Sequence, residues 1–308
     1  METLSSVEAF VRSAEAGSFS AAARKLSITP AAVSKSVAKL EDSLGARLFQ
    51  RSTRRLTLTE AGEHLFADAA KGLNTLQDAL ARVSGERLEP TGTLKVSLAP
   101  SFGRVYVQPV LPAYLRECPK VSVDWHFENR QVDLVGENFD VGIGAGIDLG
   151  AGIVAKELAR IHIVAVASKA YVKTHGTLKH PSELKDHQGV CFRSARTGKL
   201  RLWPLRNAAG KEHVDDLQQR VVFNEIEAMS AAVQAGLGIA LLPTSQVLAE
   251  LESGRLVRVL PDWWADGGPL LIYFSSQRQL PVKTRKFIDA VTAHFKDQKL
   301  AQRFRADR

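Results

Sequence analysis

Residues 18–60 read SFSAAARKLSITPAAVSKSVAKLEDSLGARLFQRSTRRLTLTE, and their apolar residues first recur with helical periodicity and then alternate as in strands. Ser20 is a favourable N-cap for a first short helix over residues 21–26, whose alanines allow another helix to approach closely. Ser27 and Ile28 then form a turn, with Ile28 as its apolar plug. The stretch therefore predicts a helix, a tight turn and a second helix.

The second helix carries clear start and stop signals. Thr29 is its N-cap, Pro30 fits the first turn, where a missing N–H is harmless, and Gly45 ends it. One face of this helix is apolar at helical spacing: Val33, Val37, Leu40 and Leu44. The opposite face is small, hydroxylic and basic, as contact with a DNA groove requires.

A basic hairpin is expected after this helix. Apolar and polar residues alternate over residues 46–59, and this pattern predicts a two-stranded wing with arginines at its tip. Residues 24–55 hold eight Lys or Arg against two acidic residues, so positive charge is concentrated where DNA phosphates would lie. The alternative is an ordinary small helical domain with a solvated basic face. The predicted DNA contacts are Ser20, Thr29, Pro30, Ala31, Ser34, Lys35 and Lys39 on the helices, and Arg51, Thr53, Arg54 and Arg55 on the wing.

A long helix is expected from Thr59, its N-cap, to about Ser84. Its apolar residues have the alternating three- and four-residue spacing of a heptad seam: Phe66, Ala69, Leu73, Leu76, Leu80 and Val83. Such a seam joins two copies of a chain, and helices that read DNA commonly work in symmetric pairs. The alternative is a helix that packs on its own domain.

The pattern changes to alternating strands and helices after a hinge at residues 86–92, which predicts an α/β domain with a parallel sheet. Strands are expected at residues 94–98, 121–127, 140–143, 238–242 and 270–274, with two more inside 153–167. Helices are expected at 103–117, kinked or late to start because of Pro109 and Pro112, and at 228–235 and 283–295.

Composition restricts the class of protein further. The chain has 308 residues, 45% of them hydrophobic, and a formal net charge of +8, which favours an anionic partner. It shows no apolar run long enough to span a membrane and no signal peptide, and Cys118 and Cys191 read as reduced thiols, so we expect a cytoplasmic protein. No metal-ligand spacing, phosphate loop or nucleophile elbow is present, so we expect no metal, no cofactor and no enzyme.

The motifs resemble those of LysR-type transcriptional regulators over nearly the whole chain. In the N-terminal part the matching elements are Phe10, Ala16-Gly17-Ser18-Phe19, Ala22-Ala23, Leu26, Ala32-Val33-Ser34, Leu40-Glu41, Leu44-Gly45, Leu48-Phe49, Arg51, Leu56, Leu58-Thr59 and Ala61-Gly62. In the C-terminal part they are Val132–Val135, Phe139–Ile143, Ala167-Ser168, Ala170-Tyr171, His180-Pro181, Leu184 and Ala235–Pro243. Members of the family often have Gln at the position of Pro30, so a base contact by that Gln is not transferred to this chain.

The resemblance implies an α + α/β architecture. A winged helix-turn-helix would occupy residues 1–58, a linker and dimerisation helix 59–90, and a two-lobed effector-binding domain 91–308, similar to type 2 periplasmic binding proteins. Lobe I would comprise residues 91–164 and 270–308, and lobe II residues 165–269. It further implies a homodimer or homotetramer and a small-molecule effector between the lobes.

Loops at strand ends and helix N-termini supply the candidates for effector contact, because free N–H groups there suit a carboxylate. They are Ser101, Phe102, Gly103, Asn129, Arg130, Gly144, Ala145, Phe192, Arg193, Asn224 and Glu225. Arg130 and Arg193 give a weak preference for an organic acid.

Three functions follow in order of preference. The first is a sequence-specific transcription regulator that binds promoter DNA under the control of an effector. The second is a small-molecule binding module whose helix-turn-helix has a role other than DNA binding. The third is an enzyme on the same α/β fold, disfavoured because no nucleophile and base pair is visible.

Overall fold

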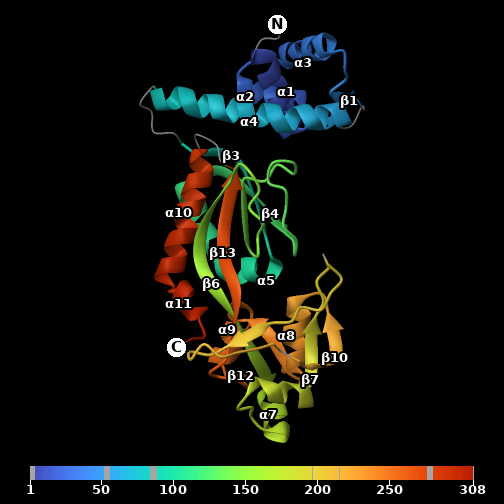
Figure 1. Ribbon diagram of the computed structural model, residues 1–308. Helices are drawn as coiled ribbons and strands as arrows, with labels where there is room; N and C mark the ends of the chain where they lie inside the picture. The colour runs from blue at the N-terminus through green and yellow to red at the C-terminus, as the bar shows by residue number, and fades with distance from the viewer. Residues whose placement is uncertain are drawn as a thin grey trace. The chain divides into compact units, whose positions relative to one another are not determined.

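The structure is a computed structural model that describes residues 4–51, 56–83, 89–195, 197–214, 216–275 and 280–307 (Figure 1). Within these ranges, the side chains of 51, 71, 74, 75 and 77–83 are not described. The chain divides into two compact units, Met1–Glu89 and Pro90–Arg308, and each is described by itself.

The N-terminal unit is a winged helix-turn-helix. Its elements are α1 (Leu4–Ala16), α2 (Phe19–Leu26), α3 (Pro30–Leu44), β1 (Phe49–Arg51), β2 (Leu56–Leu58) and α4 (Glu60–Val83). The two strands pair antiparallel, with Phe49 opposite Leu58, and form the predicted wing. Thr59 caps α4, as expected, because its Oγ1 accepts a hydrogen bond from the Gly62 N–H at 3.0 Å.

The caps of the two central helices decide where the turn lies. Thr29 Oγ1 accepts from the Ala32 N–H at 3.2 Å, and Gly45 ends α3 in the left-handed conformation, as predicted. The N-cap of α2 is Ser18 and not Ser20, because Ser18 has the extended backbone that a cap requires, and its Oγ accepts from the Ala21 N–H. Ser20 therefore lies within the first turn, where its side chain is exposed.

Two apolar residues lie outside the core that the sequence assigns to them. Ile28 is 45% exposed, because the turn before α3 is closed by backbone hydrogen bonds to the end of α2 and not by a side chain. Leu44 is 50% exposed in the last turn of α3, so Val33, Val37 and Leu40 are the apolar residues of its predicted face that are buried.

Aromatic rings fill the centre of the N-terminal unit. Phe10 and Phe49 are buried with their ring centroids 5.4 Å apart, and Phe19 meets Phe49 edge to face at 5.7 Å. The same core receives Leu73, which is 5% exposed, from α4. The first half of α4 is thus part of this compact unit.

The C-terminal unit is built on a mixed seven-stranded sheet, counted over the described residues. The order is β11-β6-β13-β5-β3-β4, with β12 also paired to β6. The strands are β3 (Thr91–Leu98), β4 (Lys120–Phe127), β5 (Val141–Ala145), β6 (Ile153–Ser168), β11 (Ala240–Pro243), β12 (Leu256–Arg258) and β13 (Ala265–Ser275). β3 is parallel to β4 and β5, whereas β13 is antiparallel to both β5 and β6. The expected parallel sheet is therefore only the β4-β3-β5 part.

Residues 153–167 form one long strand and not the two that the sequence suggests. β6 pairs with β13 between Ile153 and Ile163 and with β11 and β12 between Ile163 and Ser168. One continuous strand therefore joins the lobe I strands to the lobe II strands (Figure 1).

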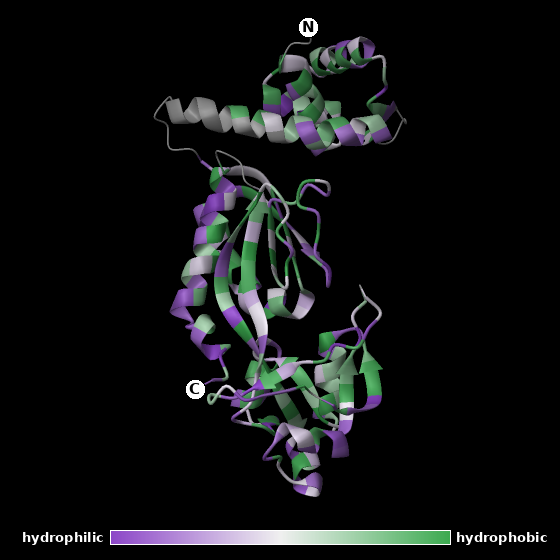
Figure 2. Ribbon diagram, viewed as in Figure 1, coloured by the Kyte–Doolittle hydropathy of each residue, from purple (hydrophilic) through white to green (hydrophobic). Residues whose placement is uncertain are grey.

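Lobe I is completed by helices on the sheet. Residues 100–117 are helical throughout, as α5 (Pro100–Phe102), the π-helical turn η1 (Gly103–Val107), the 3₁₀ turn η2 (Gln108–Val110) and α6 (Leu111–Glu117). η1 ends shortly before Pro109, which lies within η2, and η2 ends shortly before Pro112; both prolines lack the N–H that a regular α-helix needs. α10 (Val282–Asp297) alternates hydrophilic and hydrophobic residues (Figure 2), and its buried face includes Phe287, Val291 and Phe295.

Lobe II contains the remaining elements. They are α7 (Lys169–His175), η3 (Pro181–Asp186), β7 (Gln188–Phe192), β8 (Pro204–Arg206), β9 (Glu212–Val214), β10 (Gln218–Phe223), α8 (Ile226–Gln234) and α9 (Thr244–Glu252). β7 and β10 are parallel neighbours, and α11 (Leu300–Arg303) follows α10. Among the described helices, none combines the length and the apolar character that crossing a membrane requires.

Candidate DNA-binding surface and interlobe site

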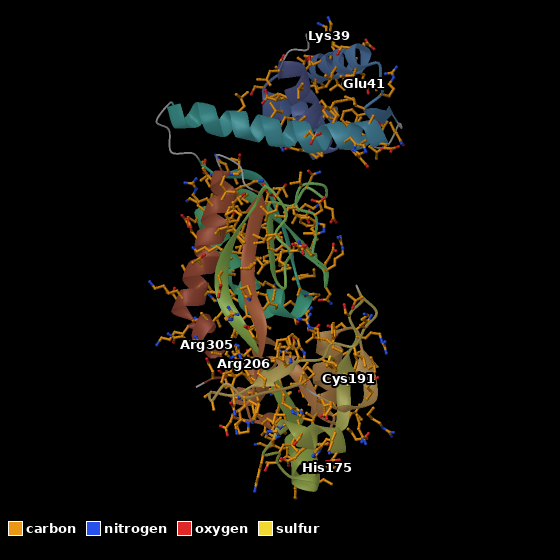
Figure 3. The ribbon with its side chains drawn as sticks, viewed as in Figure 1. Lys39, Glu41, His175, Cys191, Arg206 and Arg305 are labelled. Atoms are coloured by element: carbon orange, nitrogen blue, oxygen red, sulfur yellow. The ribbon has the colours of Figure 1, made fainter. Side chains whose placement is uncertain are left out.

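One face of α3 is exposed and basic. Ala31, Lys35 and Lys39 are exposed and lie four residues apart, so they align along the helix (Lys39 is labelled in Figure 3). Ser34 is half-buried beside them, and the opposite face holds the core residues Val33 and Val37. The helix therefore presents small and cationic side chains on the side away from its own core.

The N-terminus of α3 adds a partial positive charge at one end of this face. Thr29 is exposed, and its hydroxyl oxygen accepts the hydrogen bond from the Ala32 N–H. The hydroxyl hydrogen of Thr29 can therefore still be donated to another acceptor. Pro30 is exposed in the first turn, and the aligned peptide dipoles of the helix point toward this end. A phosphate oxygen is the kind of acceptor that such a terminus favours.

Glu41 connects the helix to the wing, and the sequence reading did not assign it this role. Its side chain is buried, and its carboxylate accepts hydrogen bonds from the backbone N–H groups of Leu48 at 2.8 Å and Phe49 at 3.1 Å, and from Arg47 Nη1 at 3.1 Å. Burial raises the pKa of Glu41, but these donors outweigh it and hold the pKa below its usual value. An acidic residue within a basic segment is the sequence signal that could have revealed this anchor.

The tip of the wing is only partly described. Arg51 ends β1, and its side chain lies outside the described atoms. Thr53, Arg54 and Arg55 lie outside the described residues altogether. Their DNA contacts stay predictions.

The predicted dimer seam lies partly in the core of its own unit. Phe66, Ala69 and Leu73 pack against the helix-turn-helix core, which is the alternative weighed for α4 from the sequence. Leu76, at 38% exposure, is the exposed member among the described seam side chains, and the side chains of Leu80 and Val83 are not described. The dimer contact stays a prediction, and Leu76 is the described seam residue whose exposure leaves it open to a partner.

Three hydrogen bonds join the two lobes at α5 and η1. Ser101 Oγ donates to Gln246 Oε1 of α9 at 2.9 Å, and the buried Tyr106 hydroxyl donates to the Ser245 carbonyl at 2.7 Å. Arg104 pairs with Glu227 in the first turn of α8. In Figure 1, α5 lies between the lobe I strands and the lobe II helices α8 and α9. Ser101 was among the predicted effector contacts, whereas Arg104, one turn further on, was missed.

Phe102 and Gly103, two further predicted effector contacts, pack against the lobe I core, and their contact with an effector stays a prediction. The Phe102 ring lies 5.2 Å from that of Tyr106 and 6.2 Å from that of Phe295. Gly103 is buried, and a Cβ there would lie 2.7 Å from the Phe127 ring, so a side chain has no room at this position.

Arg130 is not an open anion site. Its guanidinium donates to Glu137 at 2.9 and 2.6 Å and contacts Glu128 at 2.5 Å, all within lobe I. The hydrogen bond from Arg130 lowers the pKa of Glu137 to about 2. The neighbouring Asn129 is exposed in the bend after β4.

The N-terminus of α8 is likewise closed to an anion. Glu225 is the N-cap, and its carboxylate accepts from the N–H groups of Glu227 at 2.9 Å and Ala228 at 2.6 Å. These are the donors that an effector carboxylate would have used. Asn224 is exposed immediately before this cap.

The other predicted effector residues lie at strand ends. Gly144 and Ala145 end β5 and pair with Leu271 and Leu270 of β13. Arg193 is exposed and donates to the Gly198 carbonyl at 2.9 Å. Phe192 forms part of the wall of a largely apolar pocket inside lobe II, which is lined by Val190, Cys191, Phe192, Leu200, Arg201, Leu202, Trp203, Leu217, Gln219, Met229 and Leu241. No group of three or more His, Cys, Asp or Glu side chains suited to a metal ion occurs in the described part of the chain.

Comparison with known proteins identifies both parts of the chain. Residues 4–63 match the family described as bacterial regulatory helix-turn-helix protein, lysR family, and residues 87–296 match the LysR substrate binding domain. The chain is similar to the transcriptional regulator PtxR of Pseudomonas aeruginosa, at 32% identity over 94% of this chain and 92% of that protein. It is also similar to the regulator DmlR of Escherichia coli, at 32% identity over 88% of each chain.

Solved structures give the same result. Full-length AphB, a virulence activator of Vibrio cholerae, matches with a TM-score of 0.58 at 27% identity, over 94% of this chain and 99% of that one. CrgA, a LysR-type regulator of Neisseria meningitidis, matches with a TM-score of 0.60 at 26% identity, over 94% of this chain and 98% of that one.

Proposed function

The chain belongs to the LysR family of bacterial transcriptional regulators, and we propose that it reads DNA with the exposed face of α3 and senses a small molecule between its two lobes. The family identification confirms the predicted fold class and the predicted function, a DNA-binding regulator with an effector domain and not an enzyme. The residues that perform each role are the subject of the proposal.

The alignment of Ala31, Lys35 and Lys39 along α3 carries the DNA proposal. A helix that lies in the major groove needs small residues where its backbone approaches the bases closely. It also needs cationic or hydroxyl side chains where it contacts base edges and phosphates. Thr29 and Ser34 provide the hydroxyls, and Pro30 provides no donor of its own. Lys35 and Lys39 are the exposed cations of this face.

A gel-shift assay of the full chain on the DNA upstream of its own gene tests this proposal. We expect salt-sensitive binding to one segment, with unrelated DNA of the same length competing weakly. Absence of salt-sensitive binding at every adjacent intergenic segment would contradict it. That result would favour a binding module whose helix-turn-helix serves another purpose.

The effector proposal rests on the contacts of Ser101 and Arg104 across the lobes. Both side chains belong to lobe I and reach polar side chains of lobe II. Arg130 is paired with two glutamates of its own lobe and the α8 N-terminus is capped, whereas Arg104 is paired with Glu227 of the other lobe, so a ligand at the interlobe contact could reach Arg104 by displacing that glutamate. We propose that the effector is an organic acid whose carboxylate replaces Glu227 as the partner of Arg104.

Replacement of that partner would change how the lobes are held. An exposed ion pair contributes about 0–1 kcal/mol, so a bound carboxylate with additional contacts can displace Glu227. Coupling of only ~1–3 kcal/mol between the effector and DNA is enough for regulation.

A thermal-shift screen of small carboxylic acids and their amides against the full chain identifies the effector class. We expect a carboxylate to raise the unfolding midpoint by mass action, and its amide to have little effect. Arg104→Gln is expected to abolish the shift, whereas Arg116→Gln, an exposed arginine on α6, keeps it. A shift that persists in Arg104→Gln would contradict the role of Arg104. That result would not bear on the DNA proposal, which the gel-shift assay tests separately.

We further propose that the protein acts in the cytoplasm, because its DNA target is there. Regulators of this family form oligomers, and we propose a homodimer or homotetramer joined through α4 from Leu76 onward. The exposure of Leu76 in the single chain supports this part of α4 as the contact.

A further inference from the structure

The segment that follows α10 leaves lobe I and binds to lobe II. α10 packs on α6 and β3 of lobe I, and the chain then turns at Lys299, which has a left-handed backbone with φ of 52°. α11 contacts β6 and α9. Figure 1 shows α11 beside β6 and near α9, and Figure 3 labels Arg305 of this segment.

Hydrogen bonds fix this segment to β6, close to the boundary between the lobes, and to α9 and β12 of lobe II. The N–H of His162 on β6 donates to the Phe304 carbonyl at 3.3 Å, and the Thr244 hydroxyl of α9 donates to the same carbonyl. The Ala306 N–H donates to His162 Nδ1 at 2.9 Å. Arg258 Nη1 of β12 donates to the Ala306 carbonyl at 3.1 Å. The segment thus has partners on β6, close to the boundary between the lobes, and on α9 and β12 of lobe II.

The same segment is buried against lobe I. The Phe304 side chain is fully buried, and its ring meets that of Tyr106 edge to face at 5.0 Å. Leu300 and Phe295 belong to the same apolar cluster. Since Tyr106 also bonds to Ser245 of lobe II, Phe304 lies where the lobes are joined.

We propose that Leu300–Asp307 is a clasp that fixes lobe II against lobe I, and that protonation of His162 Nδ1 opens it. His162 Nδ1 accepts the Ala306 N–H, so this nitrogen carries no proton while the clasp is closed. A proton at Nδ1 would face the N–H of Ala306, donor against donor, and the hydrogen bond would be lost.

The surroundings of His162 favour the neutral ring. Its side chain is 3% exposed and stacks on the Trp264 ring at 5.8 Å, and this burial lowers the pKa of His162. Asp307, with Oδ1 3.9 Å from Nδ1, and Asp266 oppose this shift, whereas Arg305 and Arg206 add to it.

The sign of the pH dependence follows from this shift. The pKa in the closed state lies below the ordinary value of 6.5, so closure is fully favoured above that value. As the pH falls below 6.5, the open state takes up the proton first, and the fraction of open clasp rises by up to about tenfold per pH unit.

Hydrogen–deuterium exchange on the full chain between pH 8 and pH 5.5, corrected for intrinsic rates, tests the clasp. We expect peptides covering residues 300–307 to lose protection on acidification. His162→Asn keeps an acceptor near the position of Nδ1 but has no proton to gain, so its protection should not depend on pH. His294→Asn on α10 is the matched control and should behave as the unchanged chain.

Two results would overturn the proposal. One is protection of residues 300–307 that is independent of pH in the unchanged chain. The other is an undiminished pH dependence in His162→Asn. If His162→Asn fails to fold, Ala306→Pro replaces it, because this change deletes the donor without touching the ring. It should expose the segment already at pH 8, and full protection there would also contradict the clasp.

Discussion

Glu41 of α3 accepts a hydrogen bond from the backbone N–H of Leu48, at 2.8 Å, and this contact joins the helix that we propose reads DNA to the start of the wing. The same carboxylate holds the Phe49 N–H, so two buried donors depend on one side chain. The wing strand β1 therefore begins at a position that α3 determines.

Glu41→Gln is expected to loosen the wing and lower the stability of the N-terminal unit by about 2 kcal/mol, because a charge-assisted acceptor for two buried N–H groups is replaced by a neutral one. Hydrogen exchange at Leu48 and Phe49 should become about thirty-fold faster. Asp42→Asn, an exposed acid on the same helix, should leave these rates unchanged. Equal rates in Glu41→Gln and the unchanged chain would disprove the anchoring role.

The contribution of Glu41 to stability should also depend on pH. Its folded-state pKa is lowered, so the contribution is complete above the ordinary value of 4.5 and is lost as the pH falls through the lower folded-state value. The difference in stability of the N-terminal unit between the unchanged chain and Glu41→Gln should therefore be constant above pH 4.5. It should shrink as the pH falls further, until acid unfolding of the two proteins coincides at low pH.

Gly62→Ala should disrupt the junction of wing and α4. A Cβ at this position would lie 2.1 Å from the Leu48 carbonyl oxygen, a backbone atom that cannot rotate away. We expect a large loss of thermal stability in the N-terminal unit, measured by exchange of its peptides. Gly72→Ala is the matched change in the same helix, has open space around its Cβ and should stabilise by about 0.5–1 kcal/mol. Equal effects of the two changes would contradict the close approach.

The sequence predicts the local elements of this protein well, because caps and periodicity act over a few residues. Thr29, Pro30 and Gly45 delimit α3 as expected. The alternating apolar and polar residues of 46–59 form the wing strands β1 and β2. The choice of Ser18 over Ser20 as the cap of α2 depends on which residue adopts an extended backbone, and two serines so close together give the same sequence signal.

The candidate effector site is predicted less completely, since it depends on partners that are distant or unexpected. Arg130 reads as a free cation until Glu137 is brought against it by the turn between them. Glu225 reads as a contact residue, but it caps its own helix. Arg104 gains its role from Glu227, 123 residues away in the sequence. Such pairings follow from the tertiary fold and have no local pattern.

Leu73 and Leu76 should separate folding from self-association. Leu73→Ala removes a side chain buried in the core of its own unit and should cost about 2–4 kcal/mol of stability. Leu76→Ala should fold normally but raise the dissociation constant of the oligomer, measured by sedimentation velocity over a range of concentrations. A dimer that survives Leu76→Ala unchanged would move the interface away from this part of α4.

The proposed DNA surface is tested most directly by the salt dependence of binding to the DNA segment found by gel shift. Fluorescence anisotropy would compare the unchanged chain with Lys35→Ala, Lys39→Ala and the control Lys211→Ala, an exposed lysine of lobe II. We predict that each of the two α3 changes weakens binding. Where the lysine contacts a phosphate, the slope of log affinity against log salt concentration should also become smaller by about 0.9. Affinity and slope that match those of Lys211→Ala in both α3 variants would show that this face of α3 does not contact DNA.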